Sequence, residues 1–293
     1  MTGSTVDAAG VVCALRIDIA LPGNFRVPDV LAFHGRDGQQ VAERVADAEL
    51  QKGLSWQGRP ACLHIRFAPG RAFAQLDVAA PDTVLLQGAQ AEFERMVHRM
   101  LGLTQAVEAF ESAFDKHHRL GPMIARQPGL RVPLAATPFE ALVWAVAGQQ
   151  ISVTAALSLR RKMILAVGLV HAGSGLHCHP DAAALAVLDD AKLRSAGFSQ
   201  AKTRTVLGLA RAITAGELPL DAWVKLAGTP ELPVADIRAR LALLYGIGPW
   251  TIDYALLRGF GWLDGSLHGD VAVRRNLQLV LDRQDRVTER EAH

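Results

Sequence analysis

The chain has 293 residues, 50% of them hydrophobic and 20% charged, and its formal net charge is +2. This length and apolar content allow two or three small domains with real cores. No apolar run is long enough to span a membrane, no secretion signal opens the chain, and three cysteines give no disulfide framework. We expect a cytoplasmic protein without a membrane partner and exclude a disulfide-rich scaffold.

The first part of the chain predicts a mixed α+β domain. Residues 15–19 and 63–67 alternate apolar and polar side chains, which is typical of half-buried strands. Helical patterns fall near residues 28–34 and 89–101.

The apolar pattern is interrupted near residues 115–125, where Gly121 and Pro122 follow a basic stretch. We place a domain boundary there. It divides the chain into a small α+β domain over residues 1–115 and an all-α region over residues 116–293.

Two helices joined by a short step follow the boundary. Thr137, Pro138 and Glu140 form a capping-box pattern with proline at the first helical position. We expect this helix to end near Gly148 and residues 149–152 to lead into the next one.

Repeated start and stop signals then predict short helices and no strands up to about residue 280. Helix starts fall at Asp181, Asp189 and Ser199, and glycine stops fall at Gly197 and Gly216. This region is therefore expected to be all-α.

A helical hairpin with a glycine turn comes next. Residues 236–244 have helical apolar spacing, Gly246 ends that helix, and Ile247 is a buried apolar residue between Gly246 and Gly248. A proline suits the start of the second helix, which we expect to end at Gly259. The turn leaves backbone N–H groups at a helix N-terminus, where phosphate can bind. An ordinary helical hairpin is the alternative.

Four segments together resemble the AlkA-like 3-methyladenine DNA glycosylase II family, within the helix-hairpin-helix superfamily of base-excision DNA glycosylases. They are PGLRVP (128–133), TPFEALVWAVAGQQISVTAA (137–156), GIGPWTIDY (246–254) and HGDVAVRR (268–275), in the family's order and at about its spacing. The resemblance implies an α+β N-terminal domain before an all-α helix-hairpin-helix glycosylase domain. It also implies that the partner is double-stranded DNA with alkylated bases and that no cofactor or metal is needed. We expect a monomer.

In that family the aspartate of the last motif is catalytic, and it falls on Asp270 here. An alkylated purine leaves readily because it is cationic, so the carboxylate need only stabilise the oxocarbenium-like sugar and position water. Capping of the following helix is the alternative role of Asp270, and the two roles are compatible.

The family places aromatic base-pocket residues at Trp250 and Tyr254, where a flipped cationic base stacks. Burial of both rings in the hairpin core is the alternative.

Relatives that also cut the DNA backbone carry a Schiff-base lysine where this chain has Trp250. The resemblance therefore implies a monofunctional enzyme that leaves an abasic site. No cysteine follows Cys178, so the iron–sulfur loop of some relatives is absent.

The resemblance also implies the DNA contacts. Gly246, Ile247 and Gly248 bind phosphate, and Gln149 and Gln150 approach the minor groove, where Gln150 fills the gap left by the flipped nucleotide. Helix capping is an equally good explanation of the two glutamines.

Because the net charge is small, local basic side chains must add affinity for DNA. The candidates are Arg160, Arg161, Lys162, Lys202, Arg204, Arg274 and Arg275.

Two features fit the family less well. His171, His177, Cys178 and His179 cluster in the sequence but match no zinc-ligand spacing, so we expect a solvent-exposed loop. The family's tryptophan-rich C-terminal helix, which supplies one wall of the base pocket, is expected to be missing because the sequence stops at His293. A non-catalytic or impaired DNA-binding protein with the same fold is therefore the alternative function.

Overall fold

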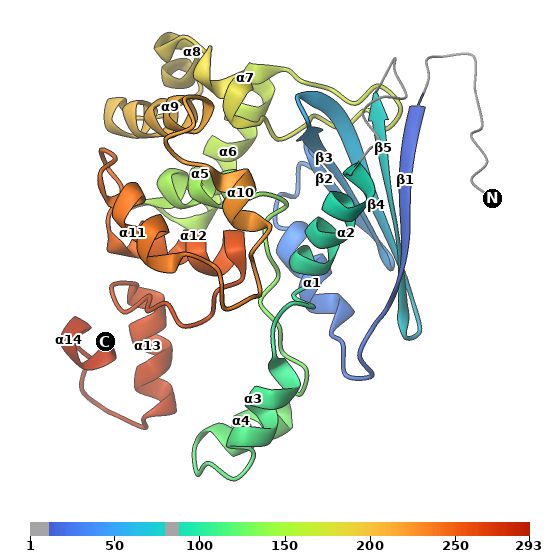
Figure 1. Ribbon diagram of the computed structural model, residues 1–293. Coiled ribbons are helices and arrows are strands. Elements are labelled where there is room, and N and C mark those ends of the chain that lie inside the picture. Colours follow the sequence, from blue (N-terminus) through green and yellow to red (C-terminus); the bar gives the residue numbers. More distant parts are fainter. Residues whose placement is uncertain (1–11, 80–87) are drawn as a thin grey trace.

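A computed structural model describes residues 12–79 and 88–293. Its N-terminal part is a five-stranded antiparallel sheet in the order β1-β5-β4-β3-β2 (Figure 1). The strands are β1 (Val12–Ala20), β2 (Glu43–Ala46), β3 (Glu49–Trp56), β4 (Arg59–Ala68) and β5 (Arg71–Ala79). Helices α1 (Val27–His34) and α2 (Ala89–Met100) cover the face that is turned toward the helical part of the chain.

The alternating residues of the sheet form one core with these two helices. Leu63 and Ile65 on β4 are fully buried and pack with Phe93 and Val97 on α2. The strands predicted at residues 15–19 and 63–67 and the helices predicted near 28–34 and 89–101 are confirmed. Strands β2, β3 and β5 were not predicted.

Helices α3 (Val107–Phe114) and α4 (Leu120–Arg126) form an arm that projects from the body of the protein (Figure 1). Arg119, between the two helices, donates a hydrogen bond of 2.8 Å to the carbonyl oxygen of Val280. The arm therefore contacts the last part of the chain.

The rest of the chain is helical, which confirms the predicted fold class. The helices are α5 (Pro138–Gly148), α6 (Val153–Val167), α7 (Ala182–Ala186), α8 (Asp190–Ser195), α9 (Gln200–Thr214), α10 (Leu220–Val224), α11 (Val234–Ala242), α12 (Pro249–Ala255), the π-helical turn η2 (Leu256–Phe260), α13 (Val271–Val280) and α14 (Glu289–Ala292). The predicted caps at Asp181, Asp189 and Ser199 each accept a backbone N–H bond. Nine of the eleven residues of α5 are buried, so α5 is the centre of this part.

The second helix of the hairpin does not end at Gly259. It continues through η2, and Gly261, with φ of +76°, closes it. Gly259 serves close packing instead, because a Cβ there would lie 2.9 Å from the Cα of Pro138. The prediction for the end of this helix was wrong because a glycine that permits helix contact and a glycine that stops a helix are not distinguished by sequence.

A buried ion network joins the sheet to the helical part. The Nζ atom of Lys52 on β3 lies 2.7 Å from carboxylate oxygens of both Glu43 and Glu140, and Arg160 on α6 contacts the same carboxylates at 3.0 and 2.8 Å. Burial opposes ionisation of Glu43 and Glu140, but the two cations outweigh it and hold the pKa of each carboxyl below its usual range. The prediction that Arg160 is available to phosphate is therefore wrong.

The same network changes the predicted cap of α5. The Thr137 hydroxyl accepts the Glu140 N–H at 3.1 Å, as predicted. The Glu140 carboxylate, however, accepts from the Ala136 N–H at 3.2 Å and from the buried cations, so the reciprocal bond of a capping box is not made.

The histidine and cysteine segment is not a solvent-exposed loop. His171, Cys178 and His179 are buried, and the backbone of His179 exchanges hydrogen bonds of 3.1 Å with Gly53 and Ser55 on β3. A Cβ at Gly53 would lie 2.3 Å from the carbonyl oxygen of His177, so this glycine permits the close approach. The prediction failed because the segment is buried by a strand more than 100 positions away in the chain.

No helix within residues 12–79 and 88–293 has the length and apolar character needed to cross a lipid bilayer.

Candidate functional site

The turn between α11 and α12 uses its two glycines differently. Gly246 has φ of +76°, and a Cβ there would lie 2.3 Å from the hydroxyl of Thr205 on α9, so only glycine fits. Ile247 is 7% exposed and packs in the helical core, as predicted. Gly248 is the extended N-cap residue of α12, and nothing lies within 4 Å of its Cβ position. The outer side of the turn is therefore open next to the N-terminus of α12.

The step between α5 and α6 lies against this turn. The side-chain amide of Gln149 donates hydrogen bonds of 3.0 Å to the carbonyl oxygen of Gly246 and to the hydroxyl of Thr251. Gln149 is at the C-cap position of α5, but its side chain binds the hairpin and not its own helix. Gln150 is exposed and has φ of +57°, which is unusual for a residue with a side chain. The structure thus brings the two predicted motifs together, and sequence reasoning missed Thr251 as their connection.

Trp250 and Tyr254 stack on one face of α12. Their ring centroids are 5.2 Å apart with an interplanar angle of 30°, and both side chains are half-buried. The alternative that both rings lie fully in the core is not what the structure shows. Burial raises the pKa of the Tyr254 phenol above its usual value.

Tyr254 also faces residues that the sequence did not single out. It lines one small cleft together with Phe33 from α1, Arg36 just after α1, Trp144 from α5 and Arg258 from η2. The sheet-bearing part and the helical part both contribute to this cleft. No pattern in the sequence brings these residues together, because they are far apart along the chain.

Asp270 is the N-cap residue of α13. Its Oδ1 atom accepts the N–H groups of Ala272 at 2.7 Å and Val273 at 3.4 Å. Arg274 donates hydrogen bonds of 3.1 Å to the carbonyl oxygens of His268 and Gly269, so it braces the preceding loop. The capping role of Asp270 is therefore present in the structure, and its catalytic role stays a prediction.

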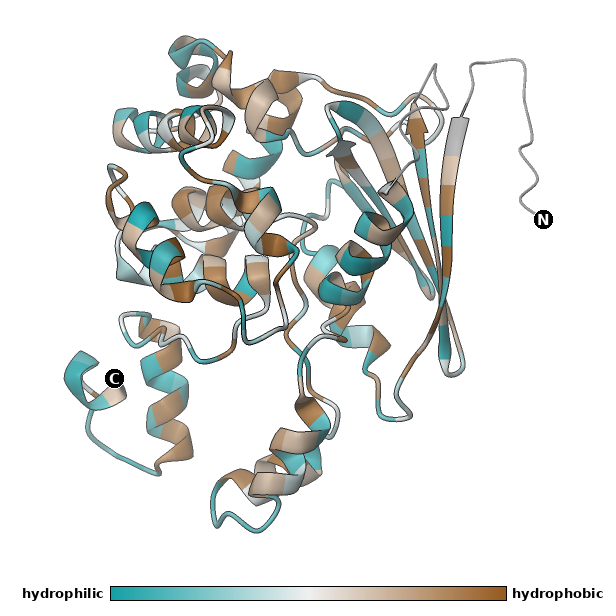
Figure 2. Cartoon of the chain, viewed as in Figure 1, coloured by the Kyte–Doolittle hydropathy of each residue, from teal (hydrophilic) through white to brown (hydrophobic). Residues whose placement is uncertain are grey.

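Helix α13 stands apart from the helical core (Figure 1). None of its residues is buried, although it carries hydrophobic residues (Figure 2). Val271 and Leu279 are 71% and 72% exposed. Asp270 lines neither the small cleft at Tyr254 nor the larger cavity between the sheet, α2, α5 and α10.

Three other basic residues that were predicted to bind phosphate differ in their contacts. Arg161 pairs with Asp37 at 2.6 Å, and the Lys202 ammonium donates to the carbonyl oxygen of Ala147 at 2.7 Å, at the end of α5. Arg204 lies over the exposed ring of Tyr245, 4.1 Å from its centroid, beside the hairpin turn. Lys202 and Arg204 are thus the candidates on the α9 side of the hairpin.

A buried acid was also missed by the sequence analysis. Asp253 on α12 is 6% exposed in its side chain and pairs with Arg238 on α11. This pair links the two helices of the hairpin. A charged residue in the middle of an otherwise uncharged helix was its only signal.

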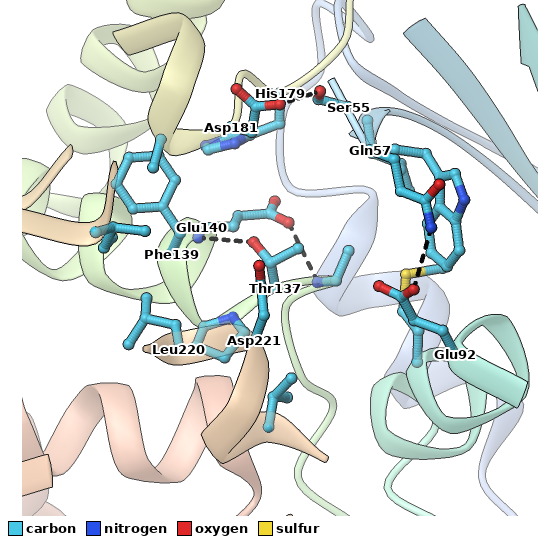
Figure 3. A pocket seen from close by; sticks show the side chains of 18 of the residues that line it. Ser55, Gln57, Glu92, Thr137, Phe139, Glu140, His179, Asp181, Leu220 and Asp221 are labelled. Atoms are coloured by element: carbon cyan, nitrogen blue, oxygen red, sulfur yellow. Dashed lines mark hydrogen bonds between the residues drawn. The ribbon is translucent and has the colours of Figure 1, made fainter. Parts of the chain in front are cut away.

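A cavity of about 390 Å³ lies elsewhere, between the sheet, α2, α5 and α10 (Figure 3). None of the predicted site residues lines it. Its polar side chains largely satisfy one another, because Ser55 donates to Asp181 at 2.6 Å and Gln57 to Glu92 at 3.3 Å. Volume alone therefore does not identify the functional site. In the described part of the chain, no three His, Cys, Asp or Glu side chains are arranged to hold a metal ion.

Comparison with known families decides the classification. Residues 143–290 match the model of the HhH-GPD superfamily base excision DNA repair proteins, and residues 16–137 match the AlkA N-terminal domain. The chain belongs to the HhH-GPD superfamily. Its sheet-bearing part is an AlkA N-terminal domain, and its helical part is the HhH-GPD domain.

Individual relatives agree with this assignment. A DNA-3-methyladenine glycosylase of Bacillus subtilis is 30% identical over 175 residues, which cover 59% of this chain and 55% of that protein. A probable bifunctional transcriptional activator/DNA repair enzyme AlkA of Mycobacterium tuberculosis is 27% identical over 283 residues, which cover 92% of this chain and 51% of that protein. The chain spans about half the length of the curated relatives it matches.

The fold is also that of a solved structure. The 3-methyladenine DNA-glycosylase from Archaeoglobus fulgidus superimposes with a TM-score of 0.77 at 19% identity. The match covers 94% of this chain and 90% of that one, so it includes both parts of the fold.

Proposed function

We propose that this HhH-GPD protein is a monofunctional DNA glycosylase. It removes alkylated purines such as 3-methyladenine and 7-methylguanine from double-stranded DNA and leaves an abasic site. The observation that carries the proposal is the contact of Gln149 with Gly246 and Thr251, because it makes the α5–α6 step and the hairpin one surface beside the stacked aromatic pair.

On this surface the hairpin binds the DNA backbone. The open space at Gly248 lets a phosphate oxygen approach the N–H groups at the start of α12. Lys202 and Arg204 on the neighbouring α9 add positive charge near the turn, and Arg274 adds it near Asp270. Gln150, exposed at the tip of the step, enters the minor groove where the damaged nucleotide leaves the stack.

The flipped base stacks against Trp250 and Tyr254. A purine alkylated on a ring nitrogen is cationic, and each cation–π contact contributes on the order of 1 kcal/mol. The positive charge of the base also weakens its bond to the sugar, so no strong acid is required for its departure.

Asp270 completes the chemistry. Its carboxylate stabilises the positive charge that develops on the sugar and orients the attacking water. The residue is half-buried at the start of α13, and one of its oxygens is already held by the Ala272 N–H. Because Trp250 stands where a lyase of this superfamily has its lysine, hydrolysis is not followed by cleavage of the DNA backbone.

The names of the relatives support the substrate class. The Bacillus subtilis protein is a DNA-3-methyladenine glycosylase, and the solved structure from Archaeoglobus fulgidus is that of a 3-methyladenine DNA-glycosylase. We propose the same class of damaged base for this chain, and we expect it to act as a monomer.

A second candidate function is DNA binding without base excision. It is favoured by the observation that α13, which carries Asp270, has no buried residue. A helix with no buried residue holds its N-terminal carboxylate less firmly than catalysis requires.

A single-turnover excision assay separates the two functions. Duplex DNA that contains 7-methylguanine or 3-methyladenine is incubated with the wild type and with Asp270→Asn, which keeps a side chain able to cap α13. Base release by the wild type alone, with strand breaks only after alkali, supports the proposed enzyme. No release by either protein, with intact DNA binding, supports the binding function. Strand breaks before alkali contradict the monofunctional assignment.

A further inference from the structure

The side chain of Arg36 lies inside an aromatic cleft formed by Phe33, Trp144 and Tyr254. The central guanidinium carbon is 4.0 Å from the Phe33 ring centroid and 4.7 Å from that of Trp144. Tyr254 lines the same cleft, and its ring stacks on Trp250. A planar, delocalised cation is therefore in contact with two aromatic rings at the place where we propose that a damaged base binds.

Polar contacts also hold Arg36 in the cleft. Its Nε–H donates to the carbonyl oxygen of Phe33 at 2.5 Å, and its guanidinium interacts with the phenol of Tyr254. Within residues 12–79 and 88–293 no carboxylate forms an ion pair with it. The residue as a whole is exposed, so its guanidinium can leave the cleft for water. Arg258, in contrast, is more enclosed and donates to the carbonyl oxygen of Pro133 at 2.7 Å.

The space that remains is too small for a ligand. With Arg36 in place, the cleft encloses about 20 Å³. This space has room for about one water molecule and is far too small for a purine. A purine can enter only when the guanidinium moves out.

We propose that the aromatic cleft is a site for a planar delocalised cation, that Arg36 occupies it in this structure, and that a flipped cationic base takes its place. Arg36 is then an internal competitor that the AlkA N-terminal domain contributes to base selection. This inference rests on the proposed function, because it concerns the base-binding site of the same reaction.

Charge balance favours an exchange of one cation for another. The Arg258 guanidinium lies 4.8 Å from the Phe33 ring centroid, so the cleft already accepts two cations near the same ring. When a cationic base replaces the Arg36 guanidinium, the local charge stays the same. A neutral base must displace the same guanidinium but gains less from the rings. The cleft therefore discriminates by charge as well as by shape.

The test uses the full chain and free nucleosides, which require no base flipping. The dissociation constants of 7-methylguanosine, a planar cation, and of guanosine, its neutral counterpart, are measured by equilibrium dialysis. Arg36→Met removes the competing guanidinium, and Arg36→Met combined with Phe33→Leu also removes one wall. Arg66→Met is the matched control, because Arg66 lies 4.5 Å from the ring centroid of Phe73 on the sheet, outside the cleft.

We expect the wild type to prefer 7-methylguanosine over guanosine. Arg36→Met should bind 7-methylguanosine roughly tenfold more tightly, the effect of removing a cation–π competitor, and guanosine should change much less. The added Phe33→Leu change should reverse most of this gain, and Arg66→Met should match the wild type.

Three results overturn the inference. They are an unchanged or weaker affinity of Arg36→Met for 7-methylguanosine, an equal gain for both nucleosides, and no binding of 7-methylguanosine by either protein. Excision from duplex DNA is measured separately on the same preparations. Excision without the nucleoside effect removes only the role of Arg36, and the nucleoside effect without excision removes only the proposed enzyme activity.

Discussion

The side-chain amide of Gln149 donates a hydrogen bond of 3.0 Å to the carbonyl oxygen of Gly246, across 97 positions of the chain. A second bond of 3.0 Å reaches the hydroxyl of Thr251. These two bonds fix the distance between the exposed Gln150 and the hairpin turn. We propose that Gln150 inserts into DNA and that the turn holds phosphate, and to act on one duplex the two must keep a fixed distance.

Gln149→Ala should loosen this connection. Two hydrogen bonds of the usual net strength correspond to a loss of about 1 to 2 kcal/mol in the free energy of unfolding, measured in urea. We also expect weaker binding to a duplex with an abasic-site analogue, because the two contact regions no longer move together. Lys192→Ala is the control on an exposed helix surface and should change both values little. Wild-type stability and binding in Gln149→Ala would show that the connection has no mechanical role.

Gln150→Gly should separate stability from activity. The positive φ of Gln150 costs a residue with a Cβ about 1 kcal/mol, and glycine is free of this cost. The variant should therefore be as stable as the wild type or slightly more stable, while base flipping falls because the side chain that we propose to insert into the DNA is gone. Flipping is followed by the fluorescence of 2-aminopurine placed next to the lesion. Unchanged flipping would assign the insertion to another residue.

The two glycines of the hairpin should respond differently to alanine. Gly246→Ala places a methyl group 2.3 Å from the Thr205 hydroxyl at a positive φ, so we expect a loss of about 2 kcal/mol or more in the free energy of unfolding. Gly248→Ala meets no atom of the protein and has an ordinary backbone conformation, so its stability should be unchanged. Its methyl group should nevertheless weaken DNA binding at low salt. Equal DNA affinity of Gly248→Ala and wild type would argue against phosphate at this turn.

Local sequence patterns predicted the elements that depend on neighbours in the chain. The caps at Thr137 and Ser199, the apolar residue between the two hairpin glycines and the alternating strand at 63–67 all follow from local hydrogen bonds and periodic burial. The fold class then followed from the order of these patterns and from the resemblance of four motifs.

Features that depend on distant contacts were not predicted. Arg160 was predicted to be a surface residue, but in the structure it is buried and paired with Glu43 and Glu140. Glu43 lies 117 positions earlier in the chain, so no local pattern indicates this contact. The aromatic cleft was missed for the same reason, since Phe33 and Trp144 meet only when the two domains are packed together. Sequence periodicity carries no information about such pairings.

The ion network between the domains should be costly to break at one residue. Glu140→Gln leaves Lys52 and Arg160 buried with one carboxylate between them, and removal of one partner from a buried ion pair typically costs about 3 to 5 kcal/mol. The free energy of unfolding in urea is the measurement. Asp236→Asn is the matched control, because it breaks an exposed pair with Arg240 and should cost less than about 0.5 kcal/mol. A similar small loss in both variants would show that water reaches the network.

Buried histidine should make stability depend on pH. Burial lowers the pKa of His179 to about 4, while the unfolded chain has a histidine pKa of about 6.5. Between these values the unfolded chain binds more protons than the folded one, so the free energy of unfolding falls as the pH falls through this window. The low pKa values of Glu43 and Glu140 have the same sign, but their stabilisation is lost only as the pH falls below about 4.5.

The histidine effect can be isolated with one substitution. Between pH 7 and pH 5.5 the wild type should lose roughly 1 kcal/mol more than His179→Gln, which has no group that titrates there. His118→Gln is the control because His118 is exposed, and it should keep the wild-type pH dependence. Urea unfolding at several pH values gives the slope for each protein. Equal slopes for the wild type and His179→Gln would mean that His179 takes up its proton without leaving the folded state, with Glu140 as the nearby anion that permits it.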